Sequence, residues 1–218
     1  MSFIVKNTTI ISPLDLIAPH SCRGCGRLGE PLCGCCKNNI LKLKVDISRL
    51  QKEHQNLPPI YTLGPRKGLL NALIHDYKYN SNRALSIVFA DLLDQKLPTL
   101  SADTCIVPLP TAHHHIRARA LDHTAKIAKY LGKKRRLKVE PILLRTKDTV
   151  QVGSDRKTRL SQAEEAYTIN PKLAINPTTT YLLLDDVWTT GATLMSATKK
   201  LREAGALNIN IVVLTISN

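Results

Sequence analysis

The sequence predicts an α/β protein with an open, mainly parallel sheet. Two short segments, Tyr181 to Leu184 and Ile211 to Leu214, are continuously apolar, as is typical of strands that helices cover on both faces. Along the chain, strand-like segments alternate with segments whose apolar residues recur at helical spacing. With 218 residues and 43% hydrophobic residues, the chain is long enough for one such domain and a small appendage.

The first elements of this pattern lie between residues 69 and 132. Apolar residues recur at helical spacing from Leu69 to Leu97, with an interruption around Asn80 to Asn82, which predicts two helices separated by a short break. A buried strand is expected over Thr104 to Leu109. A helix from Ile116 to Leu131 follows, and we expect Gly132 to end it.

The remaining elements continue the alternation to the end of the chain. They are a strand over Pro141 to Arg145, a polar stretch from Thr146 to about Arg156, a short amphipathic segment through Glu165, a strand over Tyr181 to Leu184, a helix from about Ala192 to Ala204 ended by Gly205, and a strand over Ile209 to Ile216. The last strand-helix-strand unit has the order expected of a parallel sheet.

The chain divides near residue 60. A segment rich in cysteine, and then in lysine and glutamine, ends at Leu57-Pro58-Pro59, and longer periodic segments begin there. We therefore expect an N-terminal region over residues 1–58 and an α/β domain over residues 59–218.

The formal charge of +14 and the pI near 9.7 favour an anionic partner. The basic run Lys133 to Arg136 can equally be a solvated helix end. No segment approaches the roughly 18 consecutive apolar residues of a membrane span. Polar Asn7, Thr8 and Thr9 stand where a signal peptide would need its apolar core, so we expect a cytoplasmic protein.

The cysteines are concentrated near the start of the chain. Cys22 and Cys25 form one CxxC pair, and Cys33 and Cys36 form a second. Four thiolates so spaced can close a tetrahedral zinc site, here a zinc ribbon over about residues 20–40. Because so short a segment cannot bury a core of its own, we expect the zinc to be structural. Cys35 is a spare thiol, and a redox pair is the alternative.

The main candidate site is a strand that ends in two acids and turns into a helix through a threonine-rich loop. It consists of Asp185, Asp186, Val187, Trp188, Thr189, Thr190, Gly191, Ala192 and Thr193. Such a segment places its ligand at the carboxyl edge of the sheet. Backbone N–H groups of Thr190 to Thr193 can bind an anion there, helped by the threonine hydroxyls, and Gly191 lets the backbone approach it closely.

The two acids restrict the ligand further. Asp185 and Asp186 would repel a phosphate, so we expect them to face its uncharged or cationic neighbours, either sugar hydroxyls or Mg²⁺. A sugar phosphate satisfies both halves of the loop. The alternative is an ordinary helix after an acidic turn, in which Thr189 or Thr190 is only the cap.

This segment resembles the phosphoribosyl-pyrophosphate (PRPP) signature of type I phosphoribosyltransferases. The resemblance implies a type I phosphoribosyltransferase-like fold, with Asp185 and Asp186 on the ribose 2′- and 3′-hydroxyls. It also implies that Thr189 to Thr193 bind the 5′-phosphate. Trp188 lies at a variable position of the signature, where it either packs over the ribose or anchors the loop.

With the cysteine pairs ahead of this signature, the chain resembles the ComF family over nearly its full length. These are competence-associated proteins with an N-terminal zinc ribbon and a phosphoribosyltransferase domain. Leu73 to Tyr79 resembles the family's lysine-tyrosine helix, and Val107 to Pro110 resembles its pyrophosphate-side loop. Leu144 to Thr149 resembles the segment that enters its mobile catalytic loop.

The resemblance adds Pro108, Leu109 and Arg119 to the PRPP-binding residues that it implies. Where the family commonly has Arg-Gly-Phe-Asn-Gln, this chain has Arg119 to His123 and keeps only the arginine. In a later basic stretch, Arg156 or Arg159 would either close over a pyrophosphate or lie on a helix surface.

Three adjacent histidines, His113 to His115, lie shortly after the segment Val107 to Pro110, which we call the proline loop. Three adjacent side chains on a helix or strand cannot all face one ion. We therefore do not expect a metal site at this position.

The resemblance implies binding of PRPP with Mg²⁺, or of a related nucleotide, and transfer of phosphoribosyl to an acceptor that the sequence does not identify. Catalysis would then consist of positioning and charge stabilisation around Asp185 and Asp186. The alternative is a non-catalytic DNA-uptake module that binds single-stranded DNA or a helicase partner. An aromatic content of 4% argues against a binder that stacks bases.

Overall fold

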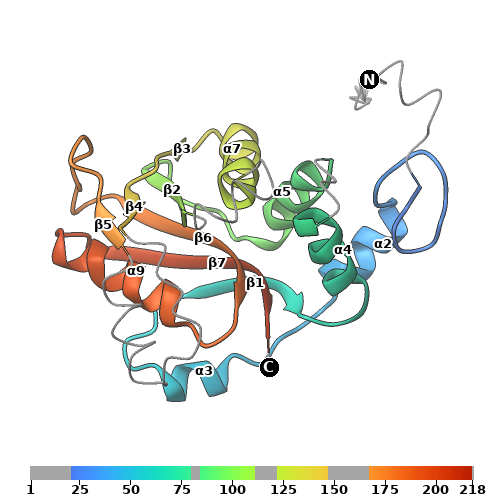
Figure 1. Ribbon diagram of the computed structural model, residues 1–218, viewed down its shortest axis with the longest axis horizontal. Helices are drawn as coiled ribbons and strands as arrows, with labels where there is room; N and C mark the ends of the chain where they lie inside the picture. Colours follow the sequence, from blue (N-terminus) through green and yellow to red (C-terminus); the bar gives the residue numbers. More distant parts are fainter. Residues whose placement is uncertain (1–20, 80–83, 111–121, 147–166, 218) are drawn as a thin grey trace, which may run out of the picture.

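The fold is built around one open, five-stranded sheet in the order β1-β7-β6-β2-β3 (Figure 1). A computed structural model describes residues 21–79, 84–110, 122–146 and 167–217. The strands are β1 (Ile60–Pro65), β2 (Thr104–Pro108), β3 (Lys138–Val139), β6 (Thr180–Trp188) and β7 (Asn208–Ile216). All neighbouring pairs in this sheet are parallel, which confirms the predicted fold class.

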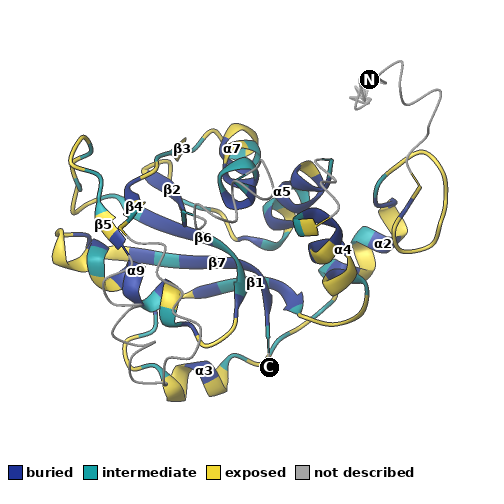
Figure 2. Ribbon diagram, in the orientation of Figure 1, coloured by how far each residue is buried: buried dark blue, intermediate teal, exposed yellow. Residues whose placement is uncertain are grey.

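Helices cover both faces of the sheet, so the central strands are buried on both sides (Figure 2). Alternate residues of β6 enter opposite cores: Leu182 and Leu184 belong to one cluster, and Tyr181 and Leu183 to the other. This two-sided burial explains why the strand sequence is continuously apolar and does not alternate. For the same reason, the continuously apolar segments of the sequence predicted parallel strands correctly.

The helices follow the order of the chain. They are α2 (Gly34–Leu41), α3 (Ser48–Glu53), α4 (Gly68–Tyr79), α5 (Leu85–Lys96), α7 (His123–Arg135) and α9 (Ala192–Glu203). Buried residues of α2, α4, α5 and α7 form one core with the sheet, and those of α3 and α9 form the other. The two helices expected between residues 69 and 97 are confirmed as α4 and α5. Helices α2 and α3 were not predicted.

The expected end of α7 at Gly132 is wrong, because the helix continues to Arg135. Arg136 then adopts the left-handed conformation with φ 56°, and its N–H donates to the Gly132 carbonyl. Gly132 is required for packing: a Cβ there would overlap the side chain of Val139 in β3. The glycine therefore permits close approach of helix and strand, a role that its chain position did not reveal.

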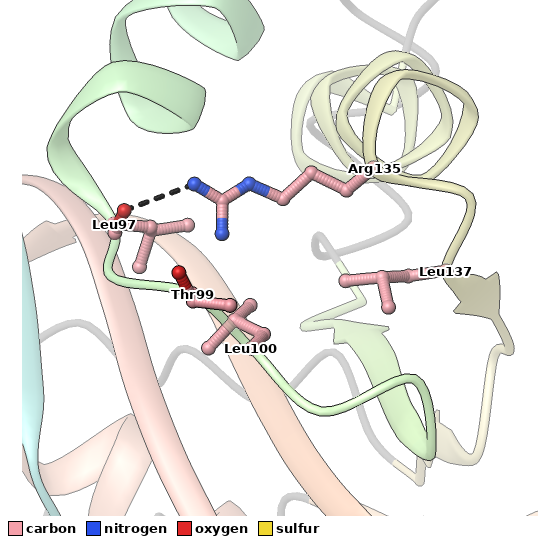
Figure 3. A pocket seen from close by; sticks show the side chains of 5 residues that line it. All are labelled: Leu97, Thr99, Leu100, Arg135 and Leu137. Atoms are coloured by element: carbon pink, nitrogen blue, oxygen red, sulfur yellow. Dashed lines mark hydrogen bonds between the residues drawn. The ribbon is translucent and has the colours of Figure 1, made fainter.

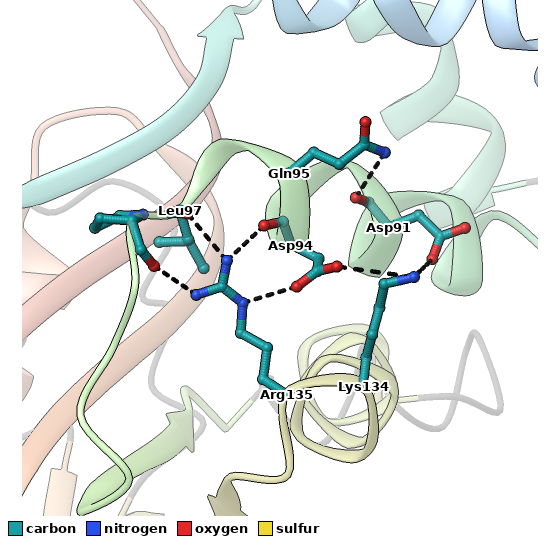
Figure 4. Close-up of polar contacts among 7 residues, drawn as sticks. Asp91, Asp94, Gln95, Leu97, Lys134 and Arg135 are labelled. Atoms are coloured by element: carbon teal, nitrogen blue, oxygen red, sulfur yellow. Dashed lines mark hydrogen bonds and ion pairs between the residues drawn. The ribbon is translucent and has the colours of Figure 1, made fainter. Parts of the chain in front are cut away.

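Polar contacts join the ends of α5 and α7 (Figure 4). The Arg135 guanidinium donates to Asp94 Oδ1 at 2.8 Å and to the carbonyl oxygens of Asp94, Leu97 and Pro98 at 2.5, 2.9 and 2.6 Å. Lys134 pairs with Asp91 at 2.8 Å. Two residues of the basic run at the end of α7 thus have structural partners.

A cavity of about 300 Å³ opens beside these contacts (Figure 3). It is lined by Leu97, Thr99, Leu100, Arg135 and Leu137. These residues precede β2 and β3, so the cavity lies at the amino edge of the sheet. It is therefore separate from the carboxyl edge, where the acidic and threonine-rich segment was expected.

The strand expected over Pro141 to Arg145 is shorter and lies outside the main sheet. Strand β4 (Leu143–Arg145) pairs antiparallel with β5 (Tyr167–Ile169), which was not predicted. The unpredicted β3 takes the place beside β2. Pro141 has no N–H to continue that ladder, so the chain leaves the sheet there.

Strand β1 was missed because its sequence contains Gly64 and Pro65, which are unusual in a strand interior. It pairs with β7 at the edge of the sheet, where such residues are tolerated. Gly64 also packs closely, because a Cβ there would lie 2.8 Å from Cδ1 of Leu43. Among the described residues, no helix is long and apolar enough to cross a membrane.

Candidate functional site

The two aspartates lie at the carboxyl edge of the sheet, immediately beyond the end of β2. Pro108, the last residue of β2, pairs with Leu184, and the Leu109 N–H donates to the Leu184 carbonyl at 2.9 Å. Asp185 and Asp186 follow directly on β6. The fold thus brings the proline loop and the acidic pair together, although more than seventy residues separate them in the sequence.

The sequence pattern suggested that this strand ends at the two acids. In the structure β6 instead continues to Trp188, with Asp185 paired to Val213 and Trp188 to Ile216 of β7. The pairing with β2 ends at Leu184, and no other strand in the described part of the chain pairs with this side of the extension. Asp185, Asp186 and Val187 are accordingly only partly buried.

The threonine-rich loop joins this extension to α9. Thr189, Thr190 and Thr193 are exposed, and Gly191 has a φ of 76° at the start of the helix. The Ala192 N–H approaches Thr190 Oγ1 at 3.4 Å, and no acidic residue occupies the first turn of α9. Exposed hydroxyls thus lie around the positive end of a helix, an arrangement that can donate hydrogen bonds to an anion.

The buried side chain of Trp188 packs against this loop and anchors it. Its side chain is 1% exposed and meets His54 edge to face, with ring centroids 5.4 Å apart. A Cβ at Gly191 would lie 2.7 Å from Cε2 of the indole. Of the two roles left open for Trp188, the geometry supports the anchor.

A lysine that the sequence analysis did not assign to the site lies against the acidic pair. Lys78, near the end of α4, places Nζ 2.5 Å from Asp186 Oδ2, and their side chains are 16% and 21% exposed. Its segment had been noted for its resemblance to the lysine-tyrosine helix, but nothing in the sequence linked it to Asp186. Only the placement of α4 against β6 makes this contact.

Burial raises the pKa of Asp185 to about 7, and the negative charge of Asp186 acts in the same direction. The Asp186 N–H donates to Asp185 Oδ1 at 2.8 Å, and this bond together with the charges of Lys78 and Arg145 partly offsets the increase. Arg145 also lies over the Tyr167 ring, 5.9 Å from its centroid. The acidic pair is therefore bordered by cations from two other elements.

The proline loop is held by the beginning of α7. Thr124 Oγ1 lies 2.7 Å from the Leu109 carbonyl and 2.9 Å from Asp122 Oδ1. Asp122 caps α7 by accepting from the Ala125 N–H at 3.1 Å. The positions of Pro108 and Leu109 thus depend on this helix.

Several residues considered in the sequence analysis lie outside the described residues. These are His113, His114, His115, Arg119, Arg156 and Arg159.

The four predicted cysteine ligands converge. The sulfur atoms of Cys22, Cys25, Cys33 and Cys36 all lie within 4.8 Å of one another, so they could hold a metal ion. Cys25 is exposed and the other three are buried. Cys35 is exposed and outside the group, and Cys105 is buried in the sheet.

The local backbone explains how the cysteines meet. The first pair lies on a tight turn in which the Gly26 N–H donates to the Cys22 carbonyl at 2.8 Å, and Gly26 has a φ of 78°. The second pair lies at the start of α2, where Cys33 is the cap residue. The Cys33 N–H points at Cys22 Sγ, 3.3 Å away.

The thiols of this cluster differ in acidity. Burial opposes ionisation of Cys22, but the backbone N–H groups of Cys33, Cys25 and Gly24 outweigh it and lower its pKa to about 6. Burial and the neighbouring cysteines raise the pKa of Cys36 to about 12. The Cys22 thiol therefore ionises more readily than an ordinary cysteine, and the thiolate is the form that binds metal.

Comparison with known proteins gives structural similarities only. No protein-family model and no curated protein matches the chain. The chain is similar to an allosteric regulatory enzyme of purine biosynthesis, with 14% sequence identity and a TM-score of 0.45. The match covers 64% of this chain and 29% of that enzyme's chain. Glutamine PRPP amidotransferase from B. subtilis, complexed with ADP and GMP, is also 14% identical, with a TM-score of 0.45 and coverage of 64% and 30%.

The chain is also similar to a purine phosphoribosyltransferase from Pyrococcus horikoshii, with 15% sequence identity and a TM-score of 0.34. This match covers 62% of this chain and 82% of the other. The chain spans less than a third of the length of the first two proteins. At these identities and TM-scores, the fold assignment rests on the strand order of the chain itself.

Proposed function

We propose that this chain is a ComF-like, phosphoribosyltransferase-type protein that binds PRPP with Mg²⁺, or a related nucleotide, at the carboxyl edge of its sheet. One observation carries the proposal. The acids Asp185 and Asp186 and the exposed threonine loop lie on one continuous strand-loop-helix segment, beside Leu109 of the proline loop. Acceptors for sugar hydroxyls and donors for a phosphate are therefore adjacent.

In this proposal, Asp185 and Asp186 accept hydrogen bonds from the ribose hydroxyls. Thr189 to Thr193 donate to the 5′-phosphate through hydroxyls and through N–H groups at the start of α9. Pro108 and Leu109 lie on the pyrophosphate side. Mg²⁺ neutralises part of the pyrophosphate charge when bound, and carboxylate oxygens are ligands of the kind that it prefers.

If the protein transfers phosphoribosyl to an acceptor, its own residues contribute position and charge. Loss of pyrophosphate leaves an electron-poor sugar, which carboxylates such as Asp185 and Asp186 stabilise.

We also propose that Cys22, Cys25, Cys33 and Cys36 hold a structural zinc. Tetrahedral zinc with Zn–S bonds of about 2.3 Å requires sulfur atoms about 3.8 Å apart, and Cys25 Sγ and Cys33 Sγ are 3.6 Å apart. Four protein thiolates would close the coordination shell. Residues 1–58 then form an N-terminal region that carries the zinc and packs through α2 and α3 against the domain over 59–218. Free thiolates of this kind suit a reducing compartment such as the cytoplasm.

The direct test is calorimetric titration of PRPP with Mg²⁺ into the wild type and into Asp185→Asn/Asp186→Asn. We expect binding by the wild type and its loss in the variant. Asp103→Asn/Glu203→Gln is the matched control, because it removes two exposed acids outside the site. Binding must survive in this control.

Trp188 supplies an independent measurement, since it is the single tryptophan of the chain and lies beneath the loop. PRPP should change its fluorescence with the same midpoint as the calorimetric titration. If the wild type shows neither signal, the nucleotide proposal fails.

The DNA-handling alternative is supported by the net charge of +14. In that case single-stranded DNA should bind with a steep salt dependence. The Asp185→Asn/Asp186→Asn variant should leave that binding intact.

A further inference from the structure

Three consecutive residues at the end of α4 contact three different parts of the protein. Asp76 pairs with Arg23, which lies in the segment from Cys22 to Cys33, called the cysteine loop below. The Tyr77 hydroxyl donates to the His123 carbonyl at 2.9 Å, and Lys78 pairs with Asp186 at 2.5 Å. Because successive helical residues point about 100° apart, one helical turn can serve all three partners.

The cysteine loop contacts α4 at two positions along the helix. Arg23 lies between Cys22 and Cys25 and reaches Asp76, whose side chain is 8% exposed. Next to it, a Cβ at Gly24 would lie 2.6 Å from Cys36 Sγ and 2.9 Å from Cδ2 of Leu69, in the first turn of α4. The turn that carries two metal-ligand candidates is thus packed against this helix and ion-paired with it.

The other end of this connection is the acidic pair. Lys78 is two residues beyond Asp76, so a rotation or shift of the last turn of α4 moves both side chains. The lysine charge acts on Asp185 as well as on Asp186, since it favours the ionised form of Asp185. A change in the position of Lys78 would therefore alter the charge environment of both carboxylates.

We infer that Arg23 is a positioning residue for the candidate site: through Asp76 it fixes the end of α4 and thereby holds Lys78 against Asp186. The metal-ligand cluster and the nucleotide site are then energetically coupled. The consequence for PRPP affinity rests on the proposed function, but the positioning of the carboxylates does not. Tyr77 supports the same turn from the α7 side, where His123 Nε2 lies 2.8 Å from the Tyr77 carbonyl.

A double-mutant cycle between Arg23 and Lys78 tests this coupling. The variants are Arg23→Ala, Lys78→Met and the combination, with Arg27→Ala as the control. Arg27 is exposed in the same loop, and the structure shows no ion pair between it and any described residue. Asp76→Asn repeats the test from the helix side and leaves the cysteine loop unchanged.

Two measurements are made on each zinc-loaded variant. The first is the dissociation constant for PRPP with Mg²⁺ by calorimetry. The second is the titration of the Asp185 carboxyl by NMR without ligand, a measurement that general destabilisation does not alter. Zinc content confirms that the cysteine loop is intact.

We expect Arg23→Ala and Asp76→Asn to weaken PRPP binding roughly three- to thirtyfold and to raise the pKa of Asp185, as Lys78→Met does. In the Lys78→Met background, both effects should vanish. Arg23→Lys should restore most of the affinity, because it keeps the charge next to Asp76.

The inference is overturned if Arg23→Ala and Asp76→Asn match Arg27→Ala in both measurements. It is also overturned if the effects of Arg23→Ala and Lys78→Met simply add. Absence of PRPP binding by the wild type would refute the proposed function instead, and the Asp185 titration would then decide the coupling alone.

Discussion

The indole of Trp188 lies directly against the Cα of Gly191, which fixes the threonine loop on the carboxyl end of β6. Gly191 has a φ of 76°, and a Cβ there would overlap Cζ2 of the ring. Backbone conformation and packing thus each demand glycine at this position. The loop is held by one buried side chain, while its threonines remain exposed.

Gly191→Ala should therefore lower the free energy of unfolding by about 2–4 kcal/mol, from left-handed strain and overlap with the indole together. Gly205→Ala is the matched control, because Gly205 also has a positive φ, 100°, but no other described residue beyond its chain neighbours places an atom within 4 Å of its Cβ position. It should cost only about 1 kcal/mol. Urea denaturation measures both, and equal losses would contradict the packing contribution.

The raised pKa of Asp185 predicts a pH-dependent stability. Between the unfolded value near 4 and the folded value of about 7, the folded state binds more protons than the unfolded state. The free energy of unfolding should therefore fall as pH rises through this window. Asp185→Asn removes this dependence, so the variant should gain stability relative to the wild type from pH 5 to pH 8.

Denaturation of both proteins across this pH range checks the prediction. Asp103→Asn, which removes an exposed carboxylate, controls for the loss of one charge. Parallel profiles for Asp185→Asn and the wild type would show that Asp185 is not desolvated in the folded protein.

Loss of one of the proposed zinc ligands should unfold the N-terminal region. Cys22→Ser/Cys36→Ser should contain no stoichiometric zinc and should lose several kcal/mol of stability, because metal binding supplies folding free energy. Cys35→Ser, which changes the exposed thiol outside the cluster, should keep both. Metal analysis measures the zinc content of each variant, and denaturation measures its stability. A wild type without zinc, or unchanged folding of the double variant, would direct attention to redox chemistry.

The contacts between α5 and α7 predict unequal effects of two neighbouring basic residues. Arg135→Ala should cost about 2–4 kcal/mol, because Asp94 and three backbone carbonyls lose their donor. Lys134→Ala should change stability by less than about 1 kcal/mol, since that side chain is 44% exposed in its ion pairs. Equal losses in urea denaturation would show that charge, and not the hydrogen bonds to the backbone carbonyls, stabilises this contact.

Much of the fold could be predicted because its signals are local. The apolar runs of β6 and β7 report burial on two faces, and the helical periodicity of α4 and α5 reports one buried stripe. Strand β1 was missed because Gly64 and Pro65 hide the apolar pattern. Gly132 was misread because close packing and helix termination both favour glycine, and the sequence does not distinguish them.

The candidate site was predictable only in part, for the same reason. The order of residues from Asp185 to Thr193 and the spacing of the four cysteines are local patterns. The role of Trp188 required its packing against Gly191 and His54. The contribution of Lys78 required the position of a helix more than one hundred residues earlier in the chain.

By itself, the sequence determined an α/β chain with a parallel sheet, a cysteine cluster and one acidic, threonine-rich loop, because apolar periodicity, spacing and turn chemistry are properties of neighbouring residues. Only the tertiary structure decided that Lys78 pairs with Asp186, that Arg23 pairs with Asp76, and that the surroundings of Asp185 raise its pKa. Strand register and helix packing set those distances, and electrostatic energies depend on distance and burial rather than on chain order.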